Sequence, residues 1–297
     1  MRRGAKPKWV MQTVECALLA YREQKALLTR EDVKDCLRER YGLKSKDVMD
    51  TNVDEASRLG YLYDLGSDED VKRLVELGYR DLTRMHGRGK LVPTVLALIH
   101  LKIYRSIDEI LRKIGVEDED KDENVKLSVR VFLNKISDVM NNILDAMFDG
   151  LREYWLGEIK RSGMVSVHRN MEEGVIVIKV ALEGGQGFEC RGGEENWEKV
   201  LDCIDKKWGN APKNLKEGLL PPEKIRSVMF VIKAFKDSIN GTPHPIPPSS
   251  IDYYEVFTNA LLDLSKYYLR QELELKKKIR NEIKELVKRE LSEGGQA

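Results

Sequence analysis

The part of the sequence best suited to do chemistry is the basic segment 80–90. Four cations gather there: Arg80, Arg84, Arg88 and Lys90. No acidic residue follows Asp81 within the segment. Because guanidinium and ammonium groups at this density attract phosphate, the segment predicts a surface that contacts a phosphate backbone.

Histidines and cysteines, which supply most metal ligands and many catalytic groups, are sparse. The sequence holds only His86, His100, His168 and His244, and only Cys16, Cys36, Cys190 and Cys203. Neither set shows the close pairs that zinc sites use. We therefore expect no metal, no cofactor and no catalytic residue. The cysteines are predicted to be small buried side chains, although a disulfide between Cys16 and Cys36, on consecutive predicted helices, stays open.

The overall charge is balanced, with 51 Lys and Arg against 50 Asp and Glu and a net charge of +1. This balance excludes a histone-like polycation and an acidic tail protein. No apolar run reaches the roughly 18 residues of a membrane span, and the basic start lacks the apolar stretch of a signal peptide. We expect a cytoplasmic protein without membrane contact. Abundant Lys and Glu with few Gln is typical of thermophiles.

A charged run, residues 117–123, divides the sequence. It has no apolar residue to bury and follows Gly115, which favours the end of a helix. The sequence thus predicts a domain over 1–116, an acidic linker over 117–123 and a second domain over 124–297. Prolines in the segment 242–248 interrupt the helices once more.

Helical spacing and capping residues place the elements of the first domain. Apolar residues recur at helical spacing over 9–24, Thr29 and Asp32 form a capping box, and Ser45 caps a third helix. A short strand over 60–63 and two helices, over 68–78 and 93–114, follow. The first domain is therefore predicted to be mainly helical.

The second domain is predicted to be α-rich, with a β-hairpin at about 164–191. One long amphipathic helix precedes the hairpin. The last helix is expected from about 250 to 291, with an apolar stripe of Tyr254, Phe257, Leu261, Leu264 and Tyr268. Such a stripe on so long a helix favours contact with another subunit, so we expect a homo-oligomer that forms through this helix. The fold class is thus mainly α with a small antiparallel β-sheet.

The order helix, helix, helix, strand over residues 9–92 resembles a winged helix-turn-helix domain. The resemblance rests on residues 28–33 and on Leu59-Gly60-Tyr61-Leu62, which looks like the entry to the wing. It implies that the third helix enters the major groove and that the wing lies along the backbone. Carried over by position, the groove-facing residues are Lys44, Lys46, Thr51, Asn52 and Arg58, and the wing residues are Arg80, Arg84, Arg88 and Lys90.

The third helix also carries four acids that would repel phosphate: Asp47, Asp50, Asp54 and Glu55. These acids favour a partner other than nucleic acid. The resemblance implies a non-catalytic protein that binds double-stranded DNA or RNA. A protein-interaction or structural module is the alternative, because winged helices of this kind often serve in docking.

An enzyme is the third possibility. The spacing of Arg80, Asp81 and His86 resembles that of small helical ribonucleases, in which a histidine transfers a proton and an arginine stabilises phosphate charge. We expect a basic turn rather than a nuclease site at this segment.

Overall fold

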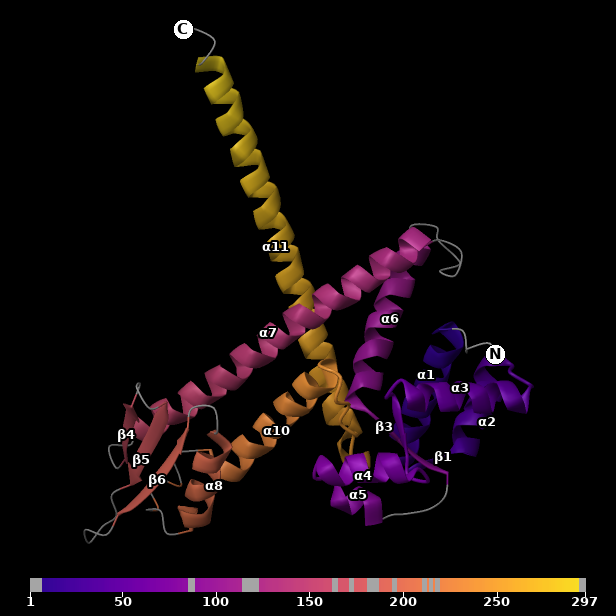
Figure 1. The fold of residues 1–297 in the computed structure, drawn as a ribbon, viewed down its shortest axis with the longest axis horizontal. Coiled ribbons are helices and arrows are strands. Elements are labelled where there is room, and N and C mark those ends of the chain that lie inside the picture. The colour runs from indigo at the N-terminus through magenta and orange to yellow at the C-terminus, as the bar shows by residue number, and fades with distance from the viewer. Residues whose placement is uncertain are drawn as a thin grey trace. The chain divides into compact units, whose positions relative to one another are not determined.

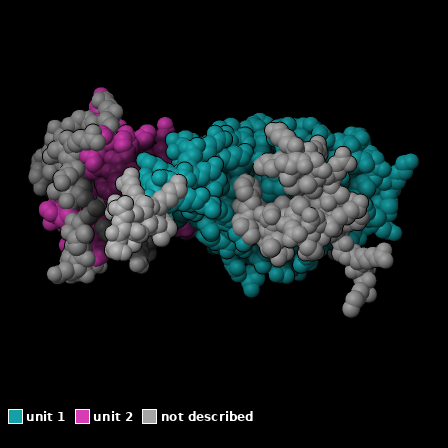
Figure 2. Space-filling model, turned by 90° about the horizontal axis from the view of Figure 1, so that it is seen from above, with its two compact units in different colours: residues 1–143, 237–297 teal, residues 144–236 magenta. Residues whose placement is uncertain are grey.

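The computed structural model describes residues 7–84, 89–113, 123–161, 165–170, 174–180, 187–193, 197–209 and 220–293, with Lys213 and Lys216. It is mostly helical with two small antiparallel sheets, which confirms the predicted fold class. Two compact units form, residues 1–143 with 237–297 and residues 144–236 (Figure 2). This division differs from the predicted one, which groups 237–297 with the hairpin. Of the predicted linker, only Glu123 belongs to the described residues.

Three helices open the first unit: α1 (Pro7–Gln24), α2 (Arg30–Tyr41) and α3 (Lys46–Arg58). The predicted capping box is present at α2, because the Thr29 side chain accepts from the Asp32 amide while the Asp32 carboxylate accepts from the Thr29 amide. Gly42, at φ 65°, ends α2 in the left-handed conformation that glycine adopts without strain. Ser45 caps α3 as predicted.

A three-stranded sheet lies beside these helices (Figure 1). It contains β1 (Leu28–Thr29), β2 (Leu62–Asp64) and β3 (Lys90–Pro93), which pair antiparallel in the order β1-β3-β2. Two short helices, α4 (Asp68–Glu76) and α5 (Arg80–Arg84), connect β2 to β3. The sheet therefore presents the α4–α5 insertion at the end of its β2–β3 hairpin.

The remaining helices of the first unit are longer: α6 (Val95–Lys113) and α11 (Ile251–Glu293), preceded by the 3-10 turn η2 (Pro248–Ser250). α7 (Glu123–Arg161) begins in this unit and ends in the other, as the single long helix that the sequence predicts. α6 packs against both α1 and α11. Among the described residues, no helix is both long enough and apolar enough to cross a membrane.

Residues 243–246, which we name the proline strap, are buried in the first unit. The Tyr21 hydroxyl donates to the Ile246 carbonyl and the Tyr63 hydroxyl to the Pro243 carbonyl, each at 2.6 Å. The Ile246 amide donates to the Pro93 carbonyl at 2.9 Å, so the strap pairs with the chain at the end of β3, the central strand of the sheet. The strap thereby ties the C-terminal segment to α1, β2 and β3.

The second unit contains β4 (Val165–Asn170), β5 (Val175–Val180) and β6 (Phe188–Gly193), paired antiparallel in that order. The helices α8 (Trp197–Trp208) and α10 (Pro222–Ile239) belong largely to this unit. Its core gathers Trp155 from α7, Ile176 and Ile178 from β5, and Val200 from α8. The predicted hairpin is therefore present as β4 and β5, with β6 as a third strand beside β5.

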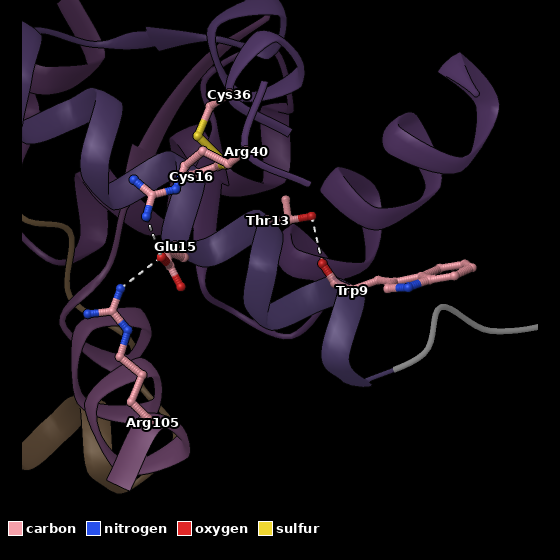
Figure 3. Close-up of a disulfide and its surroundings, with 7 residues drawn as sticks. All are labelled: Trp9, Thr13, Glu15, Cys16, Cys36, Arg40 and Arg105. Atoms are coloured by element: carbon pink, nitrogen blue, oxygen red, sulfur yellow. Dashed lines mark hydrogen bonds and ion pairs between the residues drawn. A yellow bond between two sulfur atoms is a disulfide. The ribbon is translucent and has the colours of Figure 1, made fainter. Parts of the chain in front are cut away.

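All four cysteines form disulfides. Cys16–Cys36 joins α1 to α2, with the two Cα atoms 5.6 Å apart (Figure 3), and Cys190–Cys203 joins β6 to α8, at 5.7 Å. Both separations fall in the ordinary range for a disulfide. The first pairing is the one that the sequence left open, and the second had no sequence signal.

Near the first disulfide, Glu15 of α1 forms ion pairs with Arg105 of α6 at 3.0 Å and Arg40 of α2 at 3.5 Å (Figure 3). The disulfide and this carboxylate together connect three helices of the first unit. The disulfide thus holds α1 to α2, and the ion pairs hold α1 to α2 and α6, in addition to the packing of the core.

The change Tyr21→Phe tests the strap. It removes the hydroxyl that donates to the Ile246 carbonyl and leaves that carbonyl buried without this partner, so the free energy of unfolding should fall by about 1–3 kcal/mol. Urea denaturation followed by circular dichroism measures the difference. Tyr154→Phe, at a tyrosine that is 52% exposed, is the control and should leave stability unchanged. Equal midpoints for Tyr21→Phe and the parent would contradict the role of the strap.

Loss of the Cys16–Cys36 disulfide is expected to lower the free energy of unfolding by about 3 kcal/mol, because its sequence separation of 20 closes a sizeable loop in the unfolded chain. The double change Cys16→Ala with Cys36→Ala isolates this bond from Cys190–Cys203. Urea denaturation without reductant compares the variant with the parent. A parent whose unfolding midpoint does not move when reductant is added would show that the bond does not form in solution.

Candidate nucleic-acid interface

The helix α3 is positioned by its apolar face. Met49, Val53 and Ala56 are fully buried and pack toward α1 and α2, so the opposite face of α3 is turned to solvent. The predicted groove-facing residues divide between these two faces. Lys44, Lys46 and Thr51 are exposed.

Asn52 is buried, whereas a residue that faces the groove must lie on the surface. It is 1% exposed, and its Nδ2 has no hydrogen-bond partner among the described residues. Position 52 is three residues after Met49 and four before Ala56, which places it on the buried side of the helix. The prediction carried Asn52 over by its position in the winged-helix resemblance, and position in the sequence does not show which face of α3 packs against α1 and α2.

Arg58 is exposed, but its charge is already engaged. Its guanidinium donates two hydrogen bonds to the Glu55 carboxylate, at 2.8 and 2.6 Å. These bonds hold the pKa of Glu55 below its ordinary value. A phosphate would therefore have to compete with a bidentate partner for Arg58.

Two more acids of α3 are held by cations of α2. Arg30 contacts Asp54 at 2.7 Å, and Lys34 contacts Asp50 at 2.5 Å. Lys34 is 5% exposed, so its ammonium serves the packing of α2 on α3 and not an outside ligand. Of the four acids predicted to repel phosphate, only Asp47 has no salt bridge within the described part of the chain.

The predicted wing residues lie on or near the α4–α5 insertion. Arg80 and Arg84 are exposed at the two ends of α5, and Arg84 has a loose contact of 3.4 Å with Asp81. Lys90 is half-buried at the first position of β3, paired in register with Thr29. Arg88, like His86, lies outside the described residues.

Lys90 also acts on the α2 capping box. Burial raises the pKa of Asp32, but hydrogen bonds from Thr29 and the charge of Lys90 bring that pKa below its ordinary value. Lys90 therefore stabilises the start of α2 as well as the pairing of β3 with β1. Lys44, Lys46 and Arg80 are different, because none of them has a salt bridge to another described residue.

The histidines in the described part of this unit have internal partners. His100 shares a hydrogen bond of 3.0 Å with the Tyr61 hydroxyl, and burial lowers the pKa of His100 to about 4, so its ring is neutral at pH 7. The ring of His244, in the strap, lies between the Tyr79 hydroxyl at 3.1 Å and the Asp237 carboxylate at 3.2 Å. Asp237 lies seven residues before His244 in the sequence, and the turn after α10 brings the two side chains together.

Metal chemistry has no support in the residues that can be placed. No three His, Cys, Asp or Glu side chains of the described residues gather closely enough to hold an ion. His86 lies outside the described residues, so the nuclease hypothesis for Arg80 and His86 stays a prediction. The exposed cations of α3 and of the α4–α5 insertion are then the strongest candidate site.

No protein-family model, curated protein or solved structure matches this chain, so any assignment of function depends on the residues and geometry described above.

Proposed function

We propose that residues 7–93 form a winged-helix domain that binds double-stranded nucleic acid through its phosphates, without catalysis. The order of elements supports a winged helix. Three helices are followed by an antiparallel hairpin, β2 and β3, and the short β1 pairs with β3 on its other side. In such a domain the third helix and the wing face the duplex.

The distribution of ion pairs carries the proposal. Cations of α2 and α3 neutralise Asp50, Asp54 and Glu55, while Lys44, Lys46 and Arg80 stay exposed without salt bridges to described residues. Exposed cations without salt bridges to described residues thus remain at the start of α3 and on the insertion, the two places where a winged helix meets the backbone. Phosphate contacts position a protein on the duplex but read no sequence.

The middle of α3 argues against base recognition. Asn52, the residue best suited to pair with adenine, is buried, and Arg58, the residue best suited to pair with guanine, is engaged by Glu55. We therefore propose binding that is largely independent of sequence. The cytoplasmic location and the thermophilic origin stay predictions.

A protein-assembly module without nucleic acid is the second candidate function. It is favoured by large apolar side chains that α11 exposes along its length, such as Tyr267, Tyr268 and Leu275. A salt series of binding to duplex DNA separates the two candidates. A protein that contacts phosphates binds the duplex and loses affinity as salt rises, whereas an assembly module makes no such contacts.

The double change Arg80→Ala with Arg84→Ala should reduce the magnitude of the slope of log affinity against log salt by about 2 for duplex DNA, because each phosphate contact releases counterions. Two duplexes of unrelated sequence should be weakened alike. Fluorescence anisotropy from about 50 to 200 mM salt measures the slope. Lys44→Ala with Lys46→Ala should have the same effect.

The matched control is Lys206→Ala with Lys224→Ala, two exposed lysines of the second unit. It removes the same charge and should leave the slope unchanged. An equal loss of slope in this control would show that the change in slope comes from net charge and not from the position of Arg80 and Arg84. No binding by the parent at about 50 mM salt would contradict the proposal.

The change Asp47→Asn is expected to strengthen binding. It removes the one acid of α3 without a salt bridge to a described residue, and about 1 kcal/mol of repulsion corresponds to on the order of fivefold in affinity. Glu223→Gln, an exposed acid in the first turn of α10, is the control and should change nothing. Unchanged affinity in Asp47→Asn would place the duplex away from α3.

A further inference from the structure

The helix α11 has two apolar faces, and only one of them is covered. The inner face is buried against the first unit, with Tyr254, Leu261 and Leu269 each less than 10% exposed. The other face bears the side chains that we name the outer stripe: Tyr253, Leu264, Tyr267, Tyr268, Leu275 and Ile279. Each of these is 45–64% exposed.

The outer stripe follows the geometry of the helix. Tyr253, Leu264 and Leu275 recur every eleven residues, as do Tyr268 and Ile279. Eleven residues complete almost three turns, so these positions return to the same side of a nearly straight helix. The stripe is therefore continuous over about 39 Å. In the predicted stripe, Tyr254, Leu261 and Tyr268 recur every seven residues on one side of the helix, where Tyr254 and Leu261 are buried and Tyr268 is exposed.

The stripe is large enough to support association. With about 200 Å² for a fully exposed large apolar side chain, its exposed fractions amount to on the order of 650 Å². A specific interface buries at least about 1,000 Å² in total, or about 500 Å² on each partner. A monomer that exposed this patch to water would be unusual.

We infer that the outer stripe binds the α11 helix of a second copy of this chain. Two identical stripes together supply the area of a specific interface. Tyrosines, which the stripe offers at three positions, are enriched in such interfaces.

The surrounding charges favour a copy over an anionic surface. Glu272 and Glu274 directly precede Lys276, Lys277 and Lys278, so both signs occupy one short stretch. A lipid surface or a nucleic acid prefers a uniformly basic face. Glu272 already pairs with Lys276 of α11 and with Lys135 of α7, so an identical helix meets a stretch of mixed and partly neutralised charge with little repulsion.

The inference goes beyond the proposed function and does not depend on it. A dimer through α11 carries two winged-helix domains, and linked domains bind one duplex more tightly than either domain alone. The dimer forms without nucleic acid, so its failure and the failure of nucleic-acid binding are measured separately.

The full chain without nucleic acid provides the test, by light scattering after size exclusion. The parent is expected at twice the mass of one chain, and Leu264→Glu with Leu275→Glu at the mass of one chain. The matched control is Lys206→Gln with Lys224→Gln, which changes the net charge equally at two exposed lysines outside α11. The control is expected to remain a dimer.

Leu264→Ala with Leu275→Ala guards against a variant that fails to fold. Alanine favours helix, and both leucines are about half exposed, so the fold should persist by circular dichroism. The dissociation constant of the dimer should rise at least about tenfold. A parent that stays monomeric at about 100 µM would overturn the inference. That result is expected when residues 144–236 or another protein cover the stripe. So would unchanged dimerisation in both leucine variants.

Discussion

The first unit depends on the burial of the proline strap. Residues 243–246 lie about 150 residues after β3 in the sequence, yet their backbone hydrogen-bonds to Pro93 and Val95 and receives the hydroxyls of Tyr21 and Tyr63. Buried backbone carbonyls and amides need such partners. Without the strap, the backbone at the end of β3 and the hydroxyls of Tyr21 and Tyr63 would lose these partners.

The strap also determines where α11 begins, because the helix follows it after a single turn of η2. Lys102 of α6 and Arg22 of α1 both contact Glu255 of α11, at 2.9 and 3.4 Å. The helices α1 to α3, the sheet of β1 to β3 and the long helix α11 thus belong to one unit. A residue on α11 that binds a second copy is therefore rigidly connected to the surface proposed to bind phosphate.

The sequence predicted the elements whose signals are local. The Thr29–Asp32 capping box, the Ser45 cap and the apolar spacing of α7 each lie within one segment, and each is present in the structure. Features that depend on distant segments escaped. β1 is two residues long and exists only because β3 pairs with it, and Cys190–Cys203 depends on how β6 meets α8.

The candidate site was predictable in part, for the same reason. Exposed cations at Lys44, Lys46, Arg80 and Arg84 follow from residue type, since such side chains seldom lie inside. The burial of Asn52 depends on the angle at which α3 packs against α1 and α2. The neutralisation of Asp54 likewise requires Arg30, from another helix, to reach it. Pairing between helices decided which charges remain free, and a linear sequence does not display it.

Hydrogen–deuterium exchange of the full chain, with and without a saturating amount of duplex DNA, tests the proposed mode of binding most directly. Slower exchange is predicted in peptides covering residues 44–47, at the start of α3, and residues 80–84, on the insertion. Residues 144–236 should exchange at the same rate in both samples. Protection confined to residues 144–236, or none at saturation, would contradict binding of phosphate by the winged-helix domain.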